Sequence, residues 1–277
     1  MKFAKMQGIG NDYIYVDCFH ETVDHPSELA VKLSDRHFGI GSDGIILIEP
    51  SETADCKMDM YNADGSQGKM CGNGIRCVGK YVYERGIAQK EILKVETLSG
   101  TKTLHLEVRD GRVSAVEVNM GRPIRKSSEI PVVFSKDQVL GEPLVIGGRE
   151  YRITCVSMGN PHCVVFVEDV DAIHLEEIGP LFENHPMFPD RINTEFVQIF
   201  GKDELKMRVW ERGSGETLVC GTGACAAACA AVWNQFAGRC IKIHLKGGDL
   251  SIRWDGKTDE IFMKGPAEFV FDGEVKT

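Results

Sequence analysis

The sequence predicts a mixed α/β protein of the α+β type, built from two homologous domains that each wrap a mostly antiparallel, curved β-sheet or barrel around a central helix. Two observations predict this fold. The segment MCGNG at residues 70–74 returns as VCGTG at residues 219–223, and the chain around both copies keeps one register. Short β-branched or alternating segments separated by Gly, Asp and Asn turns dominate both halves, and helical stretches are few.

The internal repeat has a fixed offset of 149 residues, which is the distance from Cys71 to Cys220 (220 − 71). The same offset superposes other pairs in separate segments, namely Gly10-Asn11 on Gly159-Asn160, Lys57-Met58 on Lys206-Met207, Tyr61 on Trp210, and Asn62 on Glu211. One register over several separated segments indicates two halves with one fold.

Each half contains the same succession of predicted strands. In the first half they cover residues 2–7, 12–18, 44–50, 56–62, 94–98, 102–108 and 112–120. In the second half they cover residues 152–158, 161–170, 193–200, 204–211, 241–246, 249–254 and 260–266. The short turns between most of these segments favour antiparallel neighbours.

Three helices are predicted, over residues 27–38, 74–86 and 223–238. Ser27 is a suitable N-cap for the first. The third is rich in alanine and apolar nearly all round, which is typical of a helix enclosed by other structure. Because the second and third each follow a cysteine motif, we expect them to be the central helices of the two domains.

The domain boundary is expected near MGRPIRK at residues 120–126, and MKGPA at 263–267 is expected to close the second half. The first domain then covers residues 1–120, completed by 268–277, and the second covers 121–267. A chain of 277 residues is long enough for two such cores.

Composition excludes several classes of protein. The net charge of −9 and the lack of a Lys/Arg cluster argue against a nucleic-acid partner, and no apolar run is long enough for a membrane span. Without a secretory signal at the N-terminus, a cytoplasmic location is expected, where the ten cysteines are thiols. No CxxC pair or zinc-like spacing occurs, so no metal is predicted. No pyridoxal lysine site, Walker loop or dinucleotide GxGxxG after a strand occurs, so no cofactor is predicted. The sequence leaves open whether two copies form a homodimer.

The two CGxG turns carry the chemistry. A cysteine directly before a helix lies near unpaired backbone N–H groups and the positive end of the helix dipole, which bind a carboxylate and favour a thiolate. Two such thiols, one on each side of a carbon atom, provide a base for one face and an acid for the other. The alternative is a helix-start turn with a buried cysteine, and the duplication in register argues against it.

MYNADGSQGKMCGNGIRC and WERGSGETLVCGTGACA resemble the two active-site motifs of the diaminopimelate epimerase family, whose members are cofactor-independent amino-acid racemases. GIGNDYIYVD, SMGNPHCV and INTEF match the family in the same order, so the resemblance covers nearly the whole chain. It implies interconversion of LL- and meso-2,6-diaminopimelate, a small amino acid, in lysine and peptidoglycan precursor biosynthesis. The related proline and hydroxyproline racemases usually carry MCGHG, so Asn73 favours the diaminopimelate branch.

The resemblance implies a role for each matched residue. Cys71 and Cys220 are the catalytic acid and base, and His162 and Glu211 tune the pKa values of the two thiols. The implied substrate-binding residues are Asn11, Asn62, Gly72, Asn73, Asn160, Asn193, Glu211, Arg212, Gly221 and Thr222. Arg212 is the expected partner of the distal carboxylate.

One position departs from the family. Some members carry a substrate-contacting glutamine where this chain has Gly44. Two other functions also stay open from the residues alone. One is an epimerase of another amino acid such as 4-hydroxyproline, and the other is a non-catalytic thiol protein that senses redox state or binds metal.

Overall fold

The computed structural model describes residues 1–276 and divides them into two compact units. Unit 1 consists of Met1–Asn119 together with the segment from Lys264 onward, and unit 2 consists of Met120–Met263. The sequence had suggested divisions after residues 120 and 267. Within residues 1–276, no helix combines the length and the apolar character that a bilayer crossing requires.

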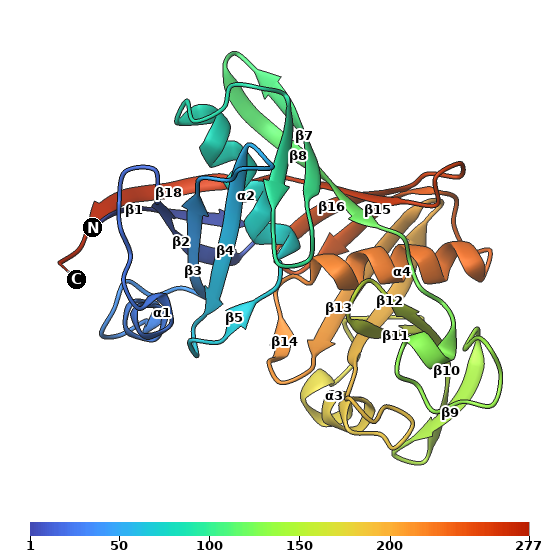
Figure 1. Cartoon of the computed structure of the whole chain (residues 1–277). Coiled ribbons are helices and arrows are strands. Elements are labelled where there is room, and N and C mark those ends of the chain that lie inside the picture. The colour runs from blue at the N-terminus through green and yellow to red at the C-terminus, as the bar shows by residue number, and fades with distance from the viewer. Residues whose placement is uncertain (277) are drawn as a thin grey trace. The chain divides into compact units, whose positions relative to one another are not determined.

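Unit 1 is a mostly antiparallel sheet with two helices. Its elements are β1 (Lys2–Gly8), β2 (Asn11–Asp17), α1 (Pro26–Ser34), β3 (Gly44–Glu49), β4 (Cys56–Asn62), β5 (Gln67–Gly68), α2 (Gly72–Glu84), β6 (Ile92–Glu96), β7 (Lys102–Arg109), β8 (Arg112–Gly121) and β18 (Glu268–Glu274). The pairs β2–β3 and β4–β6 are parallel. The pairs β1–β18, β1–β2, β3–β4, β4–β5, β6–β7 and β7–β8 are antiparallel. Figure 1 shows the C-terminal β18 in red beside the N-terminal β1 in blue.

Unit 2 repeats this arrangement. Its elements are η1 (Ser127–Glu129), β9 (Glu142–Ile146), β10 (Arg149–Ser157), β11 (Pro161–Phe166), α3 (Leu175–Glu183), β12 (Asn193–Gly201), β13 (Glu204–Glu211), β14 (Gly215–Thr217), α4 (Gly221–Trp233), β15 (Cys240–Leu245), β16 (Gly248–Trp254) and β17 (Ile261–Gly265). The parallel pairs are β11–β12 and β13–β15, at the places equivalent to those in unit 1. The predicted fold class is confirmed.

The offset of 149 residues holds in three dimensions. α1 and α3 have nine residues each, and α2 and α4 have thirteen each. Pro26 and Leu175, which begin the first pair, are 149 positions apart, as are Gly72 and Gly221, which begin the second. The strand register repeats as well, because Ile14 faces Ile45 across β2–β3 and Cys163 faces Thr194 across β11–β12.

α2 and α4 are the buried central helices. Every residue of α2 from Gly72 to Val82 is buried, and α2 packs on β1, β2, β4 and β7. α4 packs on β10, β11, β12 and β16. Small residues permit this enclosure, since a Cβ added at Gly79 of α2 would lie only 2.8 Å from Leu104 Cδ2. The packing of each central helix on the strands of its own unit therefore fixes the position of the helix N-terminus.

All three predicted helices end earlier than expected, α2 by two residues and α1 and α4 by four or more. α1 stops at Ser34 because the Asp35 carboxylate accepts the backbone N–H groups of His37 and Phe38, each at 2.7 Å, and turns the chain. α4 stops at Trp233, two residues before Gln235 takes a left-handed conformation with φ of 62°. The residues beyond these two ends are turns.

α3 was not predicted, because Gly179 and Pro180 lie inside it and both lower helix propensity. The tryptophan of β13 explains the glycine, since a Cβ at Gly179 would lie 2.2 Å from Trp210 Cδ2. The repeat offers the signal that was missed, because α3 is α1 displaced by the common offset. The strands β5, β9, β14 and β18 were not predicted either.

Candidate active site

Strand ends bring predicted site residues of unit 1 together. β2 and β3 run parallel and β4 runs antiparallel to β3, so the starts of β2 and β3 lie at the same edge as the end of β4. Asn11 begins β2, Asn62 ends β4, and Cys71 directly precedes α2. The Cys71 Sγ lies 3.2 Å from Asn11 Oδ1, so this cysteine and this asparagine are in contact.

Cys71 is the N-cap of α2. Its backbone is extended, with φ of −124° and ψ of 119°, and its sulfur accepts the backbone N–H of Gly74 at 3.3 Å. This geometry places the sulfur among the first N–H groups of the helix, which carry the positive end of the helix dipole. Gly72 and Asn73 are the first two residues of that turn, where an anion is favoured.

A charged network holds Asn11 in place. Its Nδ2 donates to Asp43 Oδ2 at 2.7 Å, which leaves Oδ1 facing Cys71. Arg36 bridges Asp43 at 3.0 Å and Asp12 at 2.8 Å, and Lys5 pairs with Asp12 at 2.5 Å. Although burial opposes it, hydrogen bonds from Arg36 and Lys5 lower the pKa of Asp12. The sequence did not identify this network.

The other two predicted site asparagines of unit 1 use their side chains within the protein. Asn73 is buried, and its Oδ1 accepts Nη1 of the buried Arg76 at 2.9 Å. Arg76 Nε in turn donates to the Pro266 carbonyl at 3.1 Å. Asn62 Nδ2 donates to Ser66 Oγ at 3.0 Å. For Asn73, the backbone is therefore the part suited to a substrate carboxylate.

Unit 2 repeats the arrangement around Cys220. Asn160 directly precedes β11, Asn193 begins the parallel β12, and Glu211 ends the antiparallel β13, so all three lie at the edge where α4 begins. Cys220 is the N-cap of α4, with φ of −125° and ψ of 108°, and its sulfur accepts the N–H of Gly223 at 3.4 Å. The two cysteines thus have the same local geometry.

Cys220 holds its proton firmly. Burial raises the pKa of this thiol well above its ordinary value, and the Glu211 and Glu195 carboxylates raise it further. Burial also raises the pKa of Glu211, against a hydrogen bond that Thr217 Oγ1 donates to its carboxylate. In unit 2 by itself, the sulfur is therefore a thiol at neutral pH.

His162 lies inside unit 2 at the centre of a hydrogen-bonded chain. Its Nδ1 lies 2.7 Å from Glu195 Oε1 and its Nε2 lies 3.0 Å from Asn160 Oδ1. Asn160 Nδ2 donates to Thr222 Oγ1 at 3.2 Å, and this hydroxyl is 3.5 Å from Cys220 Sγ. The structure therefore brings His162, Asn160 and Thr222 together beside Cys220.

Sequence analysis did not identify Glu195 as a member of this hydrogen-bonded series of side chains. His162 pairs with Asn193 across the parallel strands β11 and β12, and Glu195 is two positions further along β12, on the same face of the sheet. The strand register was the signal that could have found it. Thirty-three positions separate the two residues, so no short motif contains both.

Arg212 follows β13 and is tied to the loop that precedes β12. Its Nη1 donates to the Asp190 carbonyl at 3.0 Å, and its backbone N–H donates to Asn193 Oδ1 at 3.0 Å. Asn193 is 3% exposed, and its Nδ2 donates to the Pro161 carbonyl at 3.0 Å. Asn193 therefore holds the backbone of Arg212. Direct contact of the Asn193 side chain with substrate stays a prediction.

Gly44 begins β3 and leaves no room for the glutamine of some family members. A Cβ at this position would lie 2.1 Å from the Tyr61 carbonyl oxygen and 2.9 Å from Tyr13 Cε1. Both neighbours are held inside the sheet. A larger residue here would require the backbone of β3 or β4 to move.

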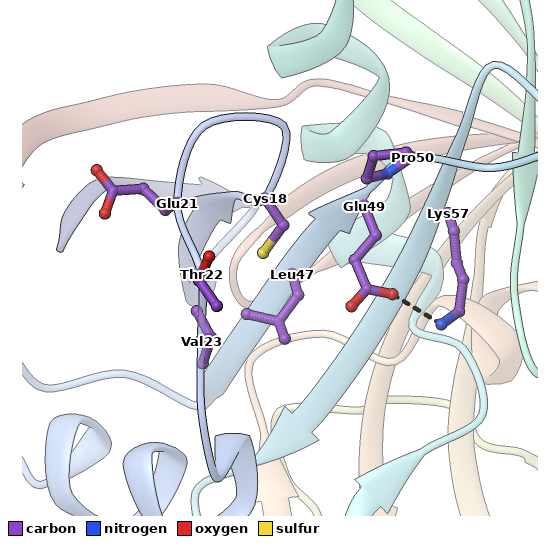
Figure 2. A pocket seen from close by; sticks show the side chains of 8 residues that line it. All are labelled: Cys18, Glu21, Thr22, Val23, Leu47, Glu49, Pro50 and Lys57. Atoms are coloured by element: carbon purple, nitrogen blue, oxygen red, sulfur yellow. Dashed lines mark hydrogen bonds and ion pairs between the residues drawn. The ribbon is translucent and has the colours of Figure 1, made fainter.

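A cavity of about 410 Å³ opens at the opposite end of these strands in unit 1. Figure 2 shows Cys18, Leu47 and the ion pair between Glu49 and Lys57 among the residues that line it. Burial raises the pKa of the Cys18 thiol to about 12. This thiol is therefore protonated near neutral pH, and the cavity lies apart from the edge that bears Asn11 and Asn62.

Comparison with known proteins decides the family. The model of the diaminopimelate epimerase family matches residues 3–126 and 154–270. The chain belongs to the diaminopimelate epimerase family. Diaminopimelate epimerase of Acetivibrio thermocellus is 58% identical over 275 residues, covering 99% of this chain and 98% of that protein. The epimerase of Pelotomaculum thermopropionicum is 55% identical over 278 residues, with 99% and 98% covered.

Solved structures share the fold at low sequence identity. A phenazine biosynthesis protein of Bacillus anthracis has a TM-score of 0.73 at 17% identity, covering 100% of this chain and 99% of that one. A hydroxyproline epimerase of Agrobacterium vitis, with bound trans-4-hydroxy-L-proline, has a TM-score of 0.68 at 15% identity, covering 99% and 90%. These similarities extend the two-unit fold beyond the diaminopimelate epimerase family.

Proposed function

We propose that this chain interconverts LL- and meso-2,6-diaminopimelate by two-base proton transfer, without a cofactor, in lysine and peptidoglycan precursor biosynthesis. The observation that carries the proposal is the pair of cysteines, each the N-cap of a central helix, in a chain of the diaminopimelate epimerase family. Two equivalent thiols suit a reaction in which the configuration of one carbon is inverted.

The proton balance of the reaction assigns the two thiols. One cysteine starts as a thiolate and removes the α-proton, and the other starts as a thiol and delivers its proton to the opposite face of the same carbon. After one turnover the protonation states are exchanged, so the reverse reaction uses the same residues in opposite roles. The proposal requires that Cys71 and Cys220 both reach this carbon.

The helix starts would stabilise the intermediate. Backbone N–H groups of Gly72 and Asn73 in α2, and of Gly221 and Thr222 in α4, are suited to the reacting carboxylate, on which negative charge accumulates when the α-proton leaves. Glu211 is assigned to the reacting ammonium group and, with His162, to the tuning of the thiols. A closed and dry site would strengthen each of these interactions.

The remaining residues would select the substrate. Diaminopimelate carries a second amino acid group at its far end, so its binding requires both donors and acceptors away from the cysteines. Arg212 suits the distal carboxylate because a guanidinium offers two parallel N–H donors. Asn11, Asn62, Asn160 and Asn193 are assigned to binding the polar groups of the substrate.

The test is α-hydrogen exchange in D2O on a panel of purified amino acids. The panel contains LL- and meso-diaminopimelate, lysine, proline and 4-hydroxyproline, and proton NMR follows loss of the α-hydrogen. The proposal predicts rapid exchange and interconversion of the two diaminopimelate isomers. Exchange of hydroxyproline alone would assign the other epimerase activity, and exchange of no amino acid would favour a non-catalytic thiol protein.

A further inference from the structure

The two units differ behind their cysteines. The common offset of 149 residues matches His162 with Tyr13 and Glu195 with Ile46. The cysteines and the helix turns are alike in backbone geometry, yet unit 2 has a buried imidazole and carboxylate where unit 1 has a phenol and a hydrocarbon. The asymmetry therefore lies in the side chains that support each thiol.

The glycine that follows each cysteine by three positions shows that Glu195 and Ile46 fill the same space. A Cβ at Gly74 would lie 2.7 Å from Ile46 Cδ1, and a Cβ at Gly223 would lie 2.6 Å from Glu195 Oε1. Gly74 and Gly223 are also the residues whose N–H groups contact the cysteine sulfur. Glu195 thus packs directly beneath the turn that holds Cys220.

Packing alone does not explain a carboxylate at this position. Glu195 and His162 are both 0% exposed, and among the described residues Glu195 Oε2 has no hydrogen-bond partner. A buried and incompletely paired carboxylate destabilises a fold, whereas the isoleucine of unit 1 fills the equivalent space without this cost. A buried carboxylate that lowers the stability of the fold is expected to have a role in the active site.

We propose that Glu195 is a positioning residue for epimerisation: it holds His162 through Nδ1, so that Nε2 faces Asn160 and, through that amide, the Thr222 hydroxyl beside Cys220. This inference rests on the proposed function. Glu195 fixes the orientation of the imidazole and the ring nitrogen that carries its hydrogen, as carboxylates behind metal-binding histidines do elsewhere. On the Cys71 side, Tyr13 and Ile46 occupy the positions equivalent to His162 and Glu195.

The charged and titratable groups around His162 come from three places. Glu195 lies on β12, Glu211 ends β13, and Cys220 precedes α4. Both carboxylates oppose ionisation of Cys220. The imidazole that Glu195 holds is linked through Asn160 and Thr222 to this same thiol. The loss of Glu195 should therefore affect the chemical step more than the binding of substrate.

The test is a double-mutant cycle with Glu195→Gln and His162→Tyr, where tyrosine is the residue that unit 1 has at the equivalent position. Each full-length variant is assayed for diaminopimelate epimerisation in both directions. We expect Glu195→Gln to lower kcat on the order of tenfold to a hundredfold, with KM changed less than about threefold. In the His162→Tyr background, Glu195→Gln should lower kcat by no more than about threefold further.

A matched control is Glu84→Gln, which alters a mostly buried carboxylate at the far end of α2 that bonds Lys80 and the Val113 N–H. Its kcat should stay within about twofold of the unaltered protein. If the losses from Glu195→Gln and His162→Tyr multiply, or if Glu195→Gln changes KM alone, the positioning role is overturned.

A second measurement needs no substrate and no stable double variant. In protein with ¹⁵N-labelled histidine, the inference predicts a His162 Nδ1–H resonance that persists from pH 6 to pH 9 and shifts in Glu195→Gln. An unprotonated His162 Nδ1 in this range overturns the inference, whatever the activity. Conversely, a chain that shows this resonance but does not exchange the α-hydrogen of diaminopimelate would overturn the proposed function alone.

Discussion

Cys220 shows how two opposing influences act on one sulfur. The helix N-terminus and the Gly223 N–H favour the thiolate, whereas burial and the carboxylates of Glu211 and Glu195 favour the thiol. In unit 2 by itself the second set prevails, and the pKa of Cys220 is raised. Substrate brings an ammonium group that would offset the carboxylates, so binding itself should make this cysteine easier to ionise.

Removal of the Glu211 charge should lower the Cys220 pKa, because a neutral amide no longer opposes the thiolate. We expect Glu211→Gln to move the pH midpoint of Cys220 alkylation by iodoacetamide downward. Peptide mass spectrometry measures the rate at each pH. Cys240, an exposed thiol, is the internal control, and its profile should not move. An unchanged Cys220 midpoint would contradict the assigned cause.

Arg212 should determine specificity for the distal carboxylate. An ammonium cannot reproduce the planar fork of a guanidinium, so Arg212→Lys should weaken kcat/KM for diaminopimelate by roughly 1.5 to 3 kcal/mol, or on the order of tenfold to a hundredfold. Lysine, which lacks this carboxylate, should already be a poor substrate and should lose little more. Equal losses on both substrates would make Arg212 a structural residue.

At the scale of elements, α3 links the core of unit 2 to the turn that carries Arg212. The Glu183 carboxylate at its end accepts Trp210 Nε1 at 2.7 Å and the Gly213 N–H at 2.8 Å. Phe182 packs on Tyr151 and Phe196 in the apolar cluster beneath. The close approach of Trp210 to Gly179 sets the distance between the helix and the sheet.

Gly179→Ala should therefore destabilise the protein, even though alanine is the better helix former. The added Cβ would overlap the Trp210 indole at 2.2 Å, and overpacking of this kind costs roughly 1 to 3 kcal/mol. Denaturant unfolding measures the change. Gly256→Ala is the control, because its nearest neighbour would be 3.8 Å away. Unchanged stability in Gly179→Ala would show that α3 adapts freely.

At the scale of the whole molecule, the repeat made most of the fold predictable. The offset is visible in the sequence because the CGxG turns require glycine and cysteine at fixed places. α3 escaped prediction because the packing of Trp210 on Gly179 overrides local propensity. Glu195 escaped because its partner His162 is a neighbour only through the parallel register of β11 and β12. Contacts of this kind depend on tertiary structure and leave no short motif.

Because the proposed reaction requires both thiols to reach one carbon, mild oxidation should join Cys71 to Cys220 and inactivate the enzyme reversibly. Peptide mapping of the oxidised protein identifies the bridge, and a reductant should restore activity. Cys18 lies at the opposite end of the strands from Cys71 and should stay reduced under the same conditions. Inactivation with both catalytic cysteines still free would argue against this mechanism.

The most direct test of the account is the rate of epimerisation by Cys71→Ala and by Cys220→Ala, each measured from LL-diaminopimelate and from the meso isomer. If each cysteine is the base in one direction and the acid in the other, both variants should lose activity in both directions, by about a hundredfold to ten-thousandfold. Near-normal turnover by either variant, in either direction, would contradict the two-base mechanism.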